Sequence, residues 1–239
     1  MHIAFLTLES PYEEHGGGIA AYLRAMTKAL IECGNRVTII AHARERGIHR
    51  LQNGALRLVH IRLPSLHWYL SRLLWGNRTA VLPLRQFEWS FAFRDAALKT
   101  LENDPPDVIE SGETGALFLA HSQLAPLVIR LHGSDYVFRN YSGAPLSWSV
   151  HLNRRLERMA LRRARAVTSP SHFQANEVAH EMDWTPERIH VIPNPINPEL
   201  LDMALNTTSF APSNKSSPVI LYVGRLAPVK GIVPLLAAA

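Results

Sequence analysis

Three consecutive glycines, Gly16 to Gly18, separate an apolar run from a helical pattern near the start of the chain. The run His2–Leu8 has the composition of a strand that is buried on both faces of a parallel sheet. After the glycines, apolar residues recur with helical spacing from Ile19 to Leu30. Glycine lets the backbone approach an anion closely, and the first N–H groups of a helix attract negative charge. The pattern therefore favours a ligand-binding loop over a simple tight turn.

A second group of polar residues follows two predicted strands. Residues 107–110 form a short strand with Glu110 and Glu113 at its end, and residues 126–131 form another strand that leads into His132-Gly-Ser-Asp-Tyr. Ligands of open α/β sheets bind at the carboxyl edge of the strands. We therefore expect His132 to belong to a site, with a histidine packed in the core as the alternative.

The remaining patterns predict the scaffold that holds these two groups. Further strands are expected at Arg36–Ala41, Leu56–Leu63, Ala166–Ser169 and Ile189–Ile192. Helices are expected at Glu88–Leu101, Ser147–Arg165 and Ser171–Met182, besides the one after the glycines. Strands that alternate with helices predict an α/β fold with a Rossmann-like, doubly wound parallel sheet.

Several nucleotide-binding classes do not fit the glycine loop. It lacks the G-x-G-x-x-G fingerprint of dinucleotide-binding proteins, and the chain holds no G-x-x-x-x-G-K-[ST] sequence. The second strand is followed by Ala41-His42-Ala43, where a dinucleotide-binding protein has an acidic residue. The sequence therefore argues against a Rossmann oxidoreductase or methyltransferase and against a P-loop protein.

A polar stretch, residues 205–217, predicts a linker between a first domain of residues 1–204 and a second of residues 218–239. In the second part, Val219–Val223 predicts a strand and a helix begins at Gly231. One strand and part of a helix cannot bury their own apolar faces. We therefore expect a truncated second Rossmann-like domain, or residues that pack on the first domain.

The segment of residues 62–94 is basic and aromatic. It holds five arginines, one glutamate and three of the five tryptophans, in a chain of net charge +5. Such an amphipathic segment is typical of a membrane-surface anchor, and ordinary packing of a helix over the sheet is the alternative. No recognised nucleic-acid-binding motif accompanies the basic residues, so no nucleic-acid partner is expected.

The cysteine content and the apolar runs predict a compartment. Cys33 is the single cysteine, which fits a reducing environment, and no cluster of metal ligands surrounds it in the sequence. The start of the chain lacks the features of a signal peptide, and no apolar run reaches the length of a membrane span. We expect a cytoplasmic protein without a metal, at the inner face of the membrane if residues 62–94 bind lipid.

An ordered set of short motifs resembles the family-4, nucleotide-sugar-dependent glycosyltransferases of the GT-B fold. The motifs are Gly17-Gly18-Ile19, the Gly34 turn, Pro106–Ile109, His132-Gly133, Leu156–Ala164, Val191–Asn194, and Tyr222–Leu226 with Lys230-Gly231. The resemblance implies two Rossmann-like domains that face a cleft, with the acceptor on the first and the donor mainly on the second. It also implies a retaining transferase that needs no metal and no cofactor besides its nucleotide-sugar donor.

The resemblance also implies roles for residues. Gly17 and Gly18 would contact the donor phosphates, and His132 would lie near the reacting sugar. Arg225 and Lys230 would neutralise the diphosphate leaving group, because its departure builds negative charge that fixed cations stabilise. On the acceptor side the candidates are Asp135, Tyr136, Glu110 and Glu113, of which a carboxylate could orient an acceptor hydroxyl.

The resemblance implies transfer of a hexosyl group to a glycan or lipid-linked acceptor, as in the synthesis of cell-envelope polysaccharides. The chain departs from the family at Pro195, where glycine is usual and where proline stiffens the hinge between domains. The family's pair of glutamates lies beyond Ala239, so this chain would carry the acceptor half and be inactive alone. Two alternatives remain: a non-catalytic binding module, and a sugar-nucleotide epimerase with the same architecture.

Overall fold

Eight strands form one sheet in the described part of the computed structural model, in the order β3-β4-β2-β1-β5-β6-β7-β8. The strands are β1 (His2–Thr7), β2 (Arg36–His42), β3 (Gly47–Leu51), β4 (Leu56–Ile61), β5 (Val108–Gly112), β6 (Leu127–Arg130), β7 (Ala166–Ser169) and β8 (Ile189–Val191). The structure describes residues 1–13, 16–74, 76–77, 80–133, 137, 147–196, 198–206, 220–224, 226 and 230–238. β3 runs antiparallel to β4, and the other neighbouring strands are parallel.

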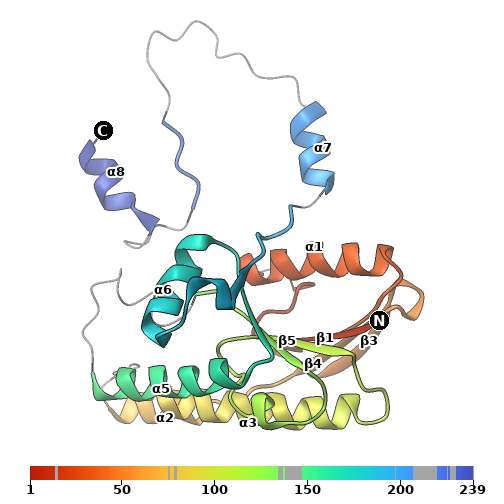
Figure 1. Cartoon of the computed structure of the whole chain (residues 1–239), viewed down its shortest axis with the longest axis horizontal. Coiled ribbons are helices and arrows are strands. Elements are labelled where there is room, and N and C mark those ends of the chain that lie inside the picture. The colour runs from red at the N-terminus through yellow and green to blue at the C-terminus, as the bar shows by residue number, and fades with distance from the viewer. Residues whose placement is uncertain are drawn as a thin grey trace, which may run out of the picture.

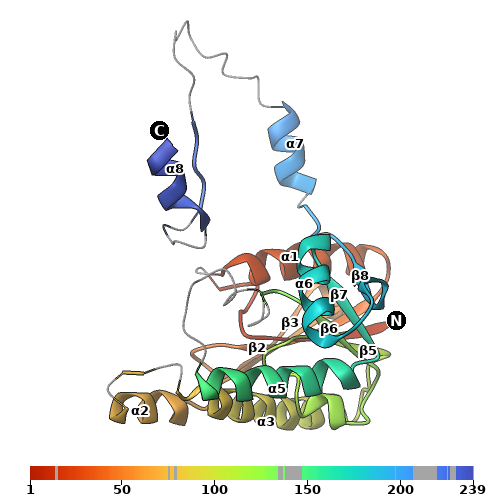
Figure 2. The same ribbon diagram turned by 60° about the vertical axis from the view of Figure 1, so that its left-hand side comes forward.

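Helices cover both faces of the sheet (Figures 1 and 2). The helices of the described residues are α1 (Gly18–Glu32), α2 (Leu66–Leu73), α3 (Leu82–Leu101), α5 (Trp148–Arg163), α6 (His172–Met182), α7 (Pro198–Asn206) and α8 (Ile232–Ala238). α1 and α6 lie on one face, and α3 and α5 lie on the other with α2 beside α3. This arrangement confirms the predicted doubly wound, Rossmann-like α/β sheet.

The two faces of the sheet carry two cores because side chains alternate along each strand. On β1, Phe5 packs with Tyr22 of α1, while the next residue, Leu6, belongs to the core that holds Phe93 of α3. All six residues of β1 are buried, as the continuous apolar run predicted. β1 pairs with β2 on one side and with β5 on the other. It is therefore the strand at which the order of the sheet reverses.

Four local features differ from the sequence prediction. No strand was predicted at β3; four of its five residues are exposed at the edge of the sheet, so no apolar periodicity marks it. α3 begins at Leu82, earlier than predicted, with a proline in its first turn. α7 was not predicted at all. Residues 220–223 form no strand, and the described part of the chain provides no partner strand for them.

The glycine at position 115 gives the first prediction. Gly115 and Gly54 both have a positive φ, +92° and +88°. A Cβ at Gly115 would lie 2.8 Å from Phe93 Cδ2 in the core, whereas a Cβ at Gly54 would meet no atom within 4 Å. Both alanine variants carry left-handed backbone strain. We expect Gly115→Ala to lower the free energy of unfolding by about 1–3 kcal/mol more than Gly54→Ala, because only the former overpacks the core. Urea denaturation of both variants measures this difference, and equal losses would contradict it.

Candidate functional site

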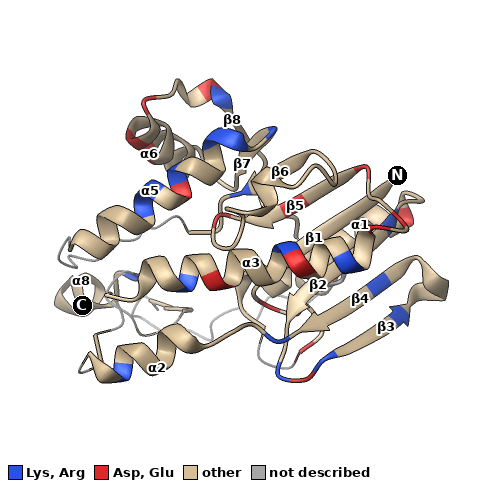
Figure 3. Cartoon of the chain, turned by 90° about the horizontal axis from the view of Figure 1, so that it is seen from below, with Lys and Arg blue, Asp and Glu red and all other residues tan. Residues whose placement is uncertain are grey.

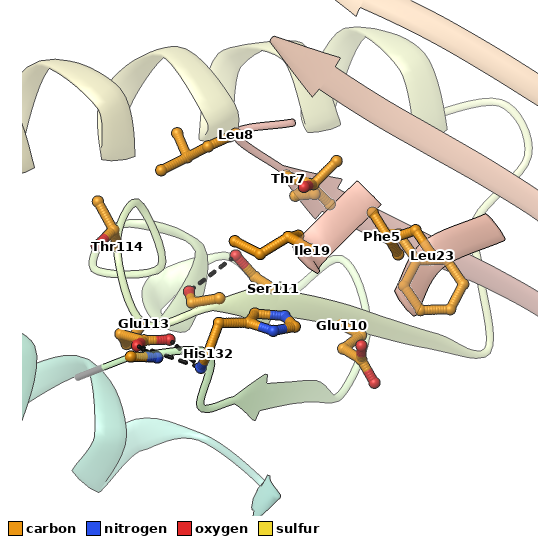
Figure 4. Close-up of a pocket in the computed structure, with 13 residues that line it drawn as sticks. Phe5, Thr7, Leu8, Ile19, Leu23, Glu110, Ser111, Glu113, Thr114 and His132 are labelled. Atoms are coloured by element: carbon orange, nitrogen blue, oxygen red, sulfur yellow. Dashed lines mark hydrogen bonds between the residues drawn. The ribbon is translucent and has the colours of Figure 1, made fainter. Parts of the chain in front are cut away.

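A pocket of about 170 Å³ lies at the carboxyl edge of the sheet, where the strand order reverses (Figure 4). The ends of β1, β5 and β6 and the first turns of α1 form its walls. Its polar lining comes from Thr7, Glu110, Ser111, Glu113, Thr114 and His132. This is the place at which open α/β sheets bind ligands. The pocket therefore brings together three of the residues that the sequence singled out, His132, Glu110 and Glu113.

Glu113 holds the backbone that carries His132. Its carboxylate accepts hydrogen bonds from the N–H of Gly133 at 2.8 Å and from the N–H of His132 at 3.1 Å. Glu113 is 5% exposed, and burial raises the pKa of its carboxyl against the opposing effect of these N–H donors. The carboxylate oxygens thus bind the backbone that follows β6. The Glu113 side chain therefore determines where the His132 backbone lies.

His132 projects into the pocket (Figure 4). Its ring meets the ring of Tyr22 edge-on, with centroids 5.4 Å apart. Burial, and secondly the charge of Arg130, lower the pKa of His132 to about 4. At neutral pH the ring therefore has one nitrogen that donates a hydrogen bond and one that accepts.

Glu110 is a second partner of Tyr22. The Tyr22 hydroxyl donates a 2.8 Å hydrogen bond to Glu110 Oε1. Burial raises the pKa of the Glu110 carboxyl, with the Tyr22 hydrogen bond and Arg130 acting against it. Burial, and then the Glu110 charge, also raise the pKa of Tyr22. Tyr22 therefore joins the two polar pocket residues that come from β5 and from the end of β6.

The glycine loop ends in the N-terminus of α1, and a carboxylate already lies there. Glu9 Oε2 accepts hydrogen bonds from the N–H of Gly17 at 2.9 Å and from the N–H of Ala20 at 3.2 Å. Gly17 is the N-cap of α1 and Gly18 is its first residue. The positive end of the helix attracts this negative charge. In this structure the N–H groups of Gly17 and Ala20 thus donate to a carboxylate of the chain itself.

The other candidates lie away from this pocket or outside the described residues. Asp135, Tyr136 and Arg225 lie outside the described part of the chain. Lys230 is exposed just before α8 and is not among the residues that line the pocket. The described residues contain no group of three or more His, Cys, Asp or Glu side chains that could hold a metal ion. Among the helices of the described residues, none is long and apolar enough to cross a membrane.

The sequence reading missed Glu9, Tyr22 and Arg130. Tyr22 lies within the apolar helical pattern from Ile19 to Leu30, and that pattern does not reveal the partner of its hydroxyl on β5. Arg130 did leave a signal, because a charged residue inside an apolar strand must find partners when it is buried. Glu9 left a weaker signal, a carboxylate eight residues before Gly17.

The strand order and the pocket define a doubly wound α/β protein with a pocket at its switch point. Residues 16–200 match the model of Glycosyltransferase Family 4, and the chain belongs to that family. It is 25% identical over 224 residues to the 2-deoxystreptamine glucosyltransferase of Streptomyces kanamyceticus. That match covers 86% of this chain and 55% of the relative, so the chain spans about half the length of the curated relative.

Two solved structures are also similar to this chain. The calicheamicin glycosyltransferase CalG4 has 15% sequence identity and a TM-score of 0.49, over 82% of this chain and 53% of its own. Arabidopsis thaliana UGT89C1 complexed with UDP has 12% identity and a TM-score of 0.47, over 87% of this chain and 55% of its own. Both TM-scores lie below 0.5, so the fold class given above depends on the strand order of this chain and not on these two structures.

The depressed pKa of His132 gives the second prediction. Its pKa is about 4 in the folded chain against 6.5 for an ordinary histidine. Between these values the unfolded chain binds a proton that the folded chain does not, so stability falls as the pH drops from about 6.5 to 4. We expect the wild-type free energy of unfolding to fall by up to about 3 kcal/mol relative to that of His132→Gln over this range. Urea denaturation across pH measures the difference, and parallel pH profiles would contradict the prediction. Glu110 and Glu113, whose pKa values are raised, contribute to the pH dependence of both proteins, so their contributions cancel in the difference between the wild type and His132→Gln.

Proposed function

We propose that this chain forms the acceptor-side half of a retaining glycosyltransferase that takes a sugar from a nucleoside-diphosphate donor. The observation that carries the proposal is the neutral His132, held by Glu113 at the switch point next to the N-terminus of α1. Membership of Glycosyltransferase Family 4 supports the same class of reaction. Family membership supports the class of reaction only, and the use of a nucleotide-sugar donor and of an acceptor is part of our proposal.

The chemistry of sugar transfer suits this arrangement. A neutral imidazole can accept a hydrogen bond from a sugar hydroxyl or donate one to it, and so orient the reacting sugar without adding a charge beside it. The leaving nucleoside diphosphate gains negative charge as its bond to the sugar breaks. The N–H groups of Gly17 and Gly18 at the start of α1 would bind its phosphates. A phosphate at Gly17 would displace the Glu9 carboxylate, which now accepts from that N–H.

The remainder of the donor site would come from outside the described pocket. A cavity of about 170 Å³ is smaller than the 300–1,000 Å³ or so of a complete small-molecule site. We infer that a second domain closes over the pocket and that Arg225 and Lys230 neutralise the diphosphate there, with no metal. Asp135 and Tyr136 would line the acceptor side together with Glu110. The 239-residue chain alone would then bind substrates without transferring sugar.

A lipid-linked acceptor is the form of acceptor that the outer surface of α2 and α3 favours. Trp68, Tyr69 and Leu73 of α2 and Phe91 of α3 are 43%, 60%, 76% and 61% exposed. Arg72 lies over the Trp68 ring at 5.0 Å. Figure 3 shows Lys and Arg on α2 and α3, with Asp and Glu among them along α3. Exposed aromatic and basic side chains together suit an anionic membrane surface, so we propose peripheral contact through residues 62–94 at the cytoplasmic face.

Replacement of His132 tests the transferase. In the polypeptide as its own cell makes it, we expect His132→Ala to lower kcat for sugar transfer on the order of 100-fold or more. The assay measures transfer from labelled nucleoside-diphosphate sugars. His121→Ala is the matched control, because His121 is exposed and does not line the pocket. A polypeptide that binds nucleoside diphosphates and transfers no sugar would favour a binding module instead.

Charge reversal at Arg72 tests the membrane contact. We expect Arg72→Glu to weaken binding to vesicles that contain anionic lipid by about 10-fold or more at low salt, because each basic residue near the surface contributes about 1 kcal/mol. Vesicle flotation measures the bound fraction. Arg188→Glu is the control, since Arg188 also lies over a tryptophan, Trp184 at 4.1 Å, but belongs to neither α2 nor α3. Equal losses in the two variants, or no binding by the wild type, would contradict the contact.

A further inference from the structure

Arg130 is a buried cation that the proposed reaction does not use. It ends β6, two residues before His132, and is 1% exposed. A buried guanidinium is costly unless hydrogen-bond acceptors or an aromatic ring compensate for the water that it loses. The partners of Arg130 therefore indicate what the burial of this charge achieves.

The first partners lie in the segment that follows β8. Arg130 Nη2 donates hydrogen bonds to the carbonyl oxygen of Ile192 at 2.9 Å and to Asn194 Oδ1 at 2.8 Å. Its Nε atom is buried and has no hydrogen-bond partner among the described residues. The hydrogen bonds that orient the guanidinium thus come from the segment at residues 192–194, through which the chain leaves the sheet.

The second partner is the ring of Tyr22, over which the guanidinium lies at 4.3 Å from the centroid. The same ring contacts His132 edge-on at 5.4 Å, and its hydroxyl donates to Glu110. Tyr22 thus contacts Arg130 as well as the two pocket residues His132 and Glu110. A movement of the guanidinium would therefore move the ring against which His132 packs.

We propose that Arg130 and Asn194 are positioning residues that connect the segment after β8 to the pocket. Asn194 orients the guanidinium, the guanidinium orients the Tyr22 ring, and that ring sets the places of the His132 imidazole and the Glu110 carboxylate. The inference rests on the proposed function only in taking His132 as the group beside the reacting sugar. The coupling between Asn194 and the His132 ring does not depend on that assumption, and it can be measured without any substrate.

A side-chain change at Asn194 tests this coupling. Asn194 is exposed, so Asn194→Ala leaves the core intact while it removes one acceptor from Arg130. The measurement is the NMR signals of the His132 ring in the 239-residue chain, assigned by their loss in His132→Gln. Asn35→Ala is the matched control, because it also removes one side-chain hydrogen bond, from Asn35 to the Leu30 carbonyl oxygen at the far end of α1.

We expect the His132 ring signals to shift in Asn194→Ala and to stay unchanged in Asn35→Ala. Asn194→Asp keeps an acceptor for Arg130 and should leave the signals close to their wild-type positions. Arg130→Lys should shift the signals as Asn194→Ala does, because an ammonium lacks the planar guanidinium that lies over the Tyr22 ring. Unchanged signals in Asn194→Ala, or equal shifts in Asn194→Ala and Asn194→Asp, would overturn the inference.

The same variants separate this inference from the proposed reaction. If the native polypeptide transfers sugar, Asn194→Ala should lower kcat on the order of 10-fold with a smaller change in the donor KM, since the contact positions a group and does not bind the donor. Asn194→Asp should restore the rate. Shifted His132 signals in a polypeptide without transferase activity would refute the proposed function and leave the positioning role standing.

Discussion

The structure depends on the position of β1, which pairs with β2 on one side and β5 on the other. The chain builds the sheet outward from β1 in opposite directions, so the loops that follow β1 and β5 leave a crevice where they diverge. Both faces of β1 are buried under helices, which makes the place of this crevice rigid. The pocket, the glycine loop and His132 all lie at this one edge because parallel strands present their carboxyl ends together.

Carboxylates determine the geometry of that edge. Glu113 accepts from the backbone that carries His132, Glu110 accepts from Tyr22, and Glu9 accepts from the N-terminus of α1. Glu9 follows β1, whereas Glu110 lies in β5 and Glu113 just after it. Buried or partly buried charges need such partners, and once paired they permit few alternative arrangements of the surrounding loops. The site is therefore organised by electrostatics on a frame that hydrophobic packing supplies.

The opening βαβ unit, the alternation of strands and helices and the strand before His132 could all be predicted, because local periodicity records which faces of an element are buried. The positions of His132, Glu110 and Glu113 at one edge followed from the same reasoning. β3 and α7 escaped prediction: β3 shows no apolar alternation, and no pattern predicted a helix between Pro198 and Asn206. The predicted strand at Val219–Val223 is wrong for residues 220–223, since a strand exists only where another strand pairs with it.

By itself the sequence determined the fold class, the family resemblance and the chemical types available at the sheet edge, because these depend on residue type and on spacing along the chain. The tertiary structure decided the use of each group. Glu113 supports the backbone of His132, and Arg130 reaches residues 192 and 194 together with Tyr22. Those contacts join residues 19 to 108 positions apart in the sequence. The spacing of residues along the chain does not predict these contacts, because such partners meet only when the sheet brings separate strands to one edge.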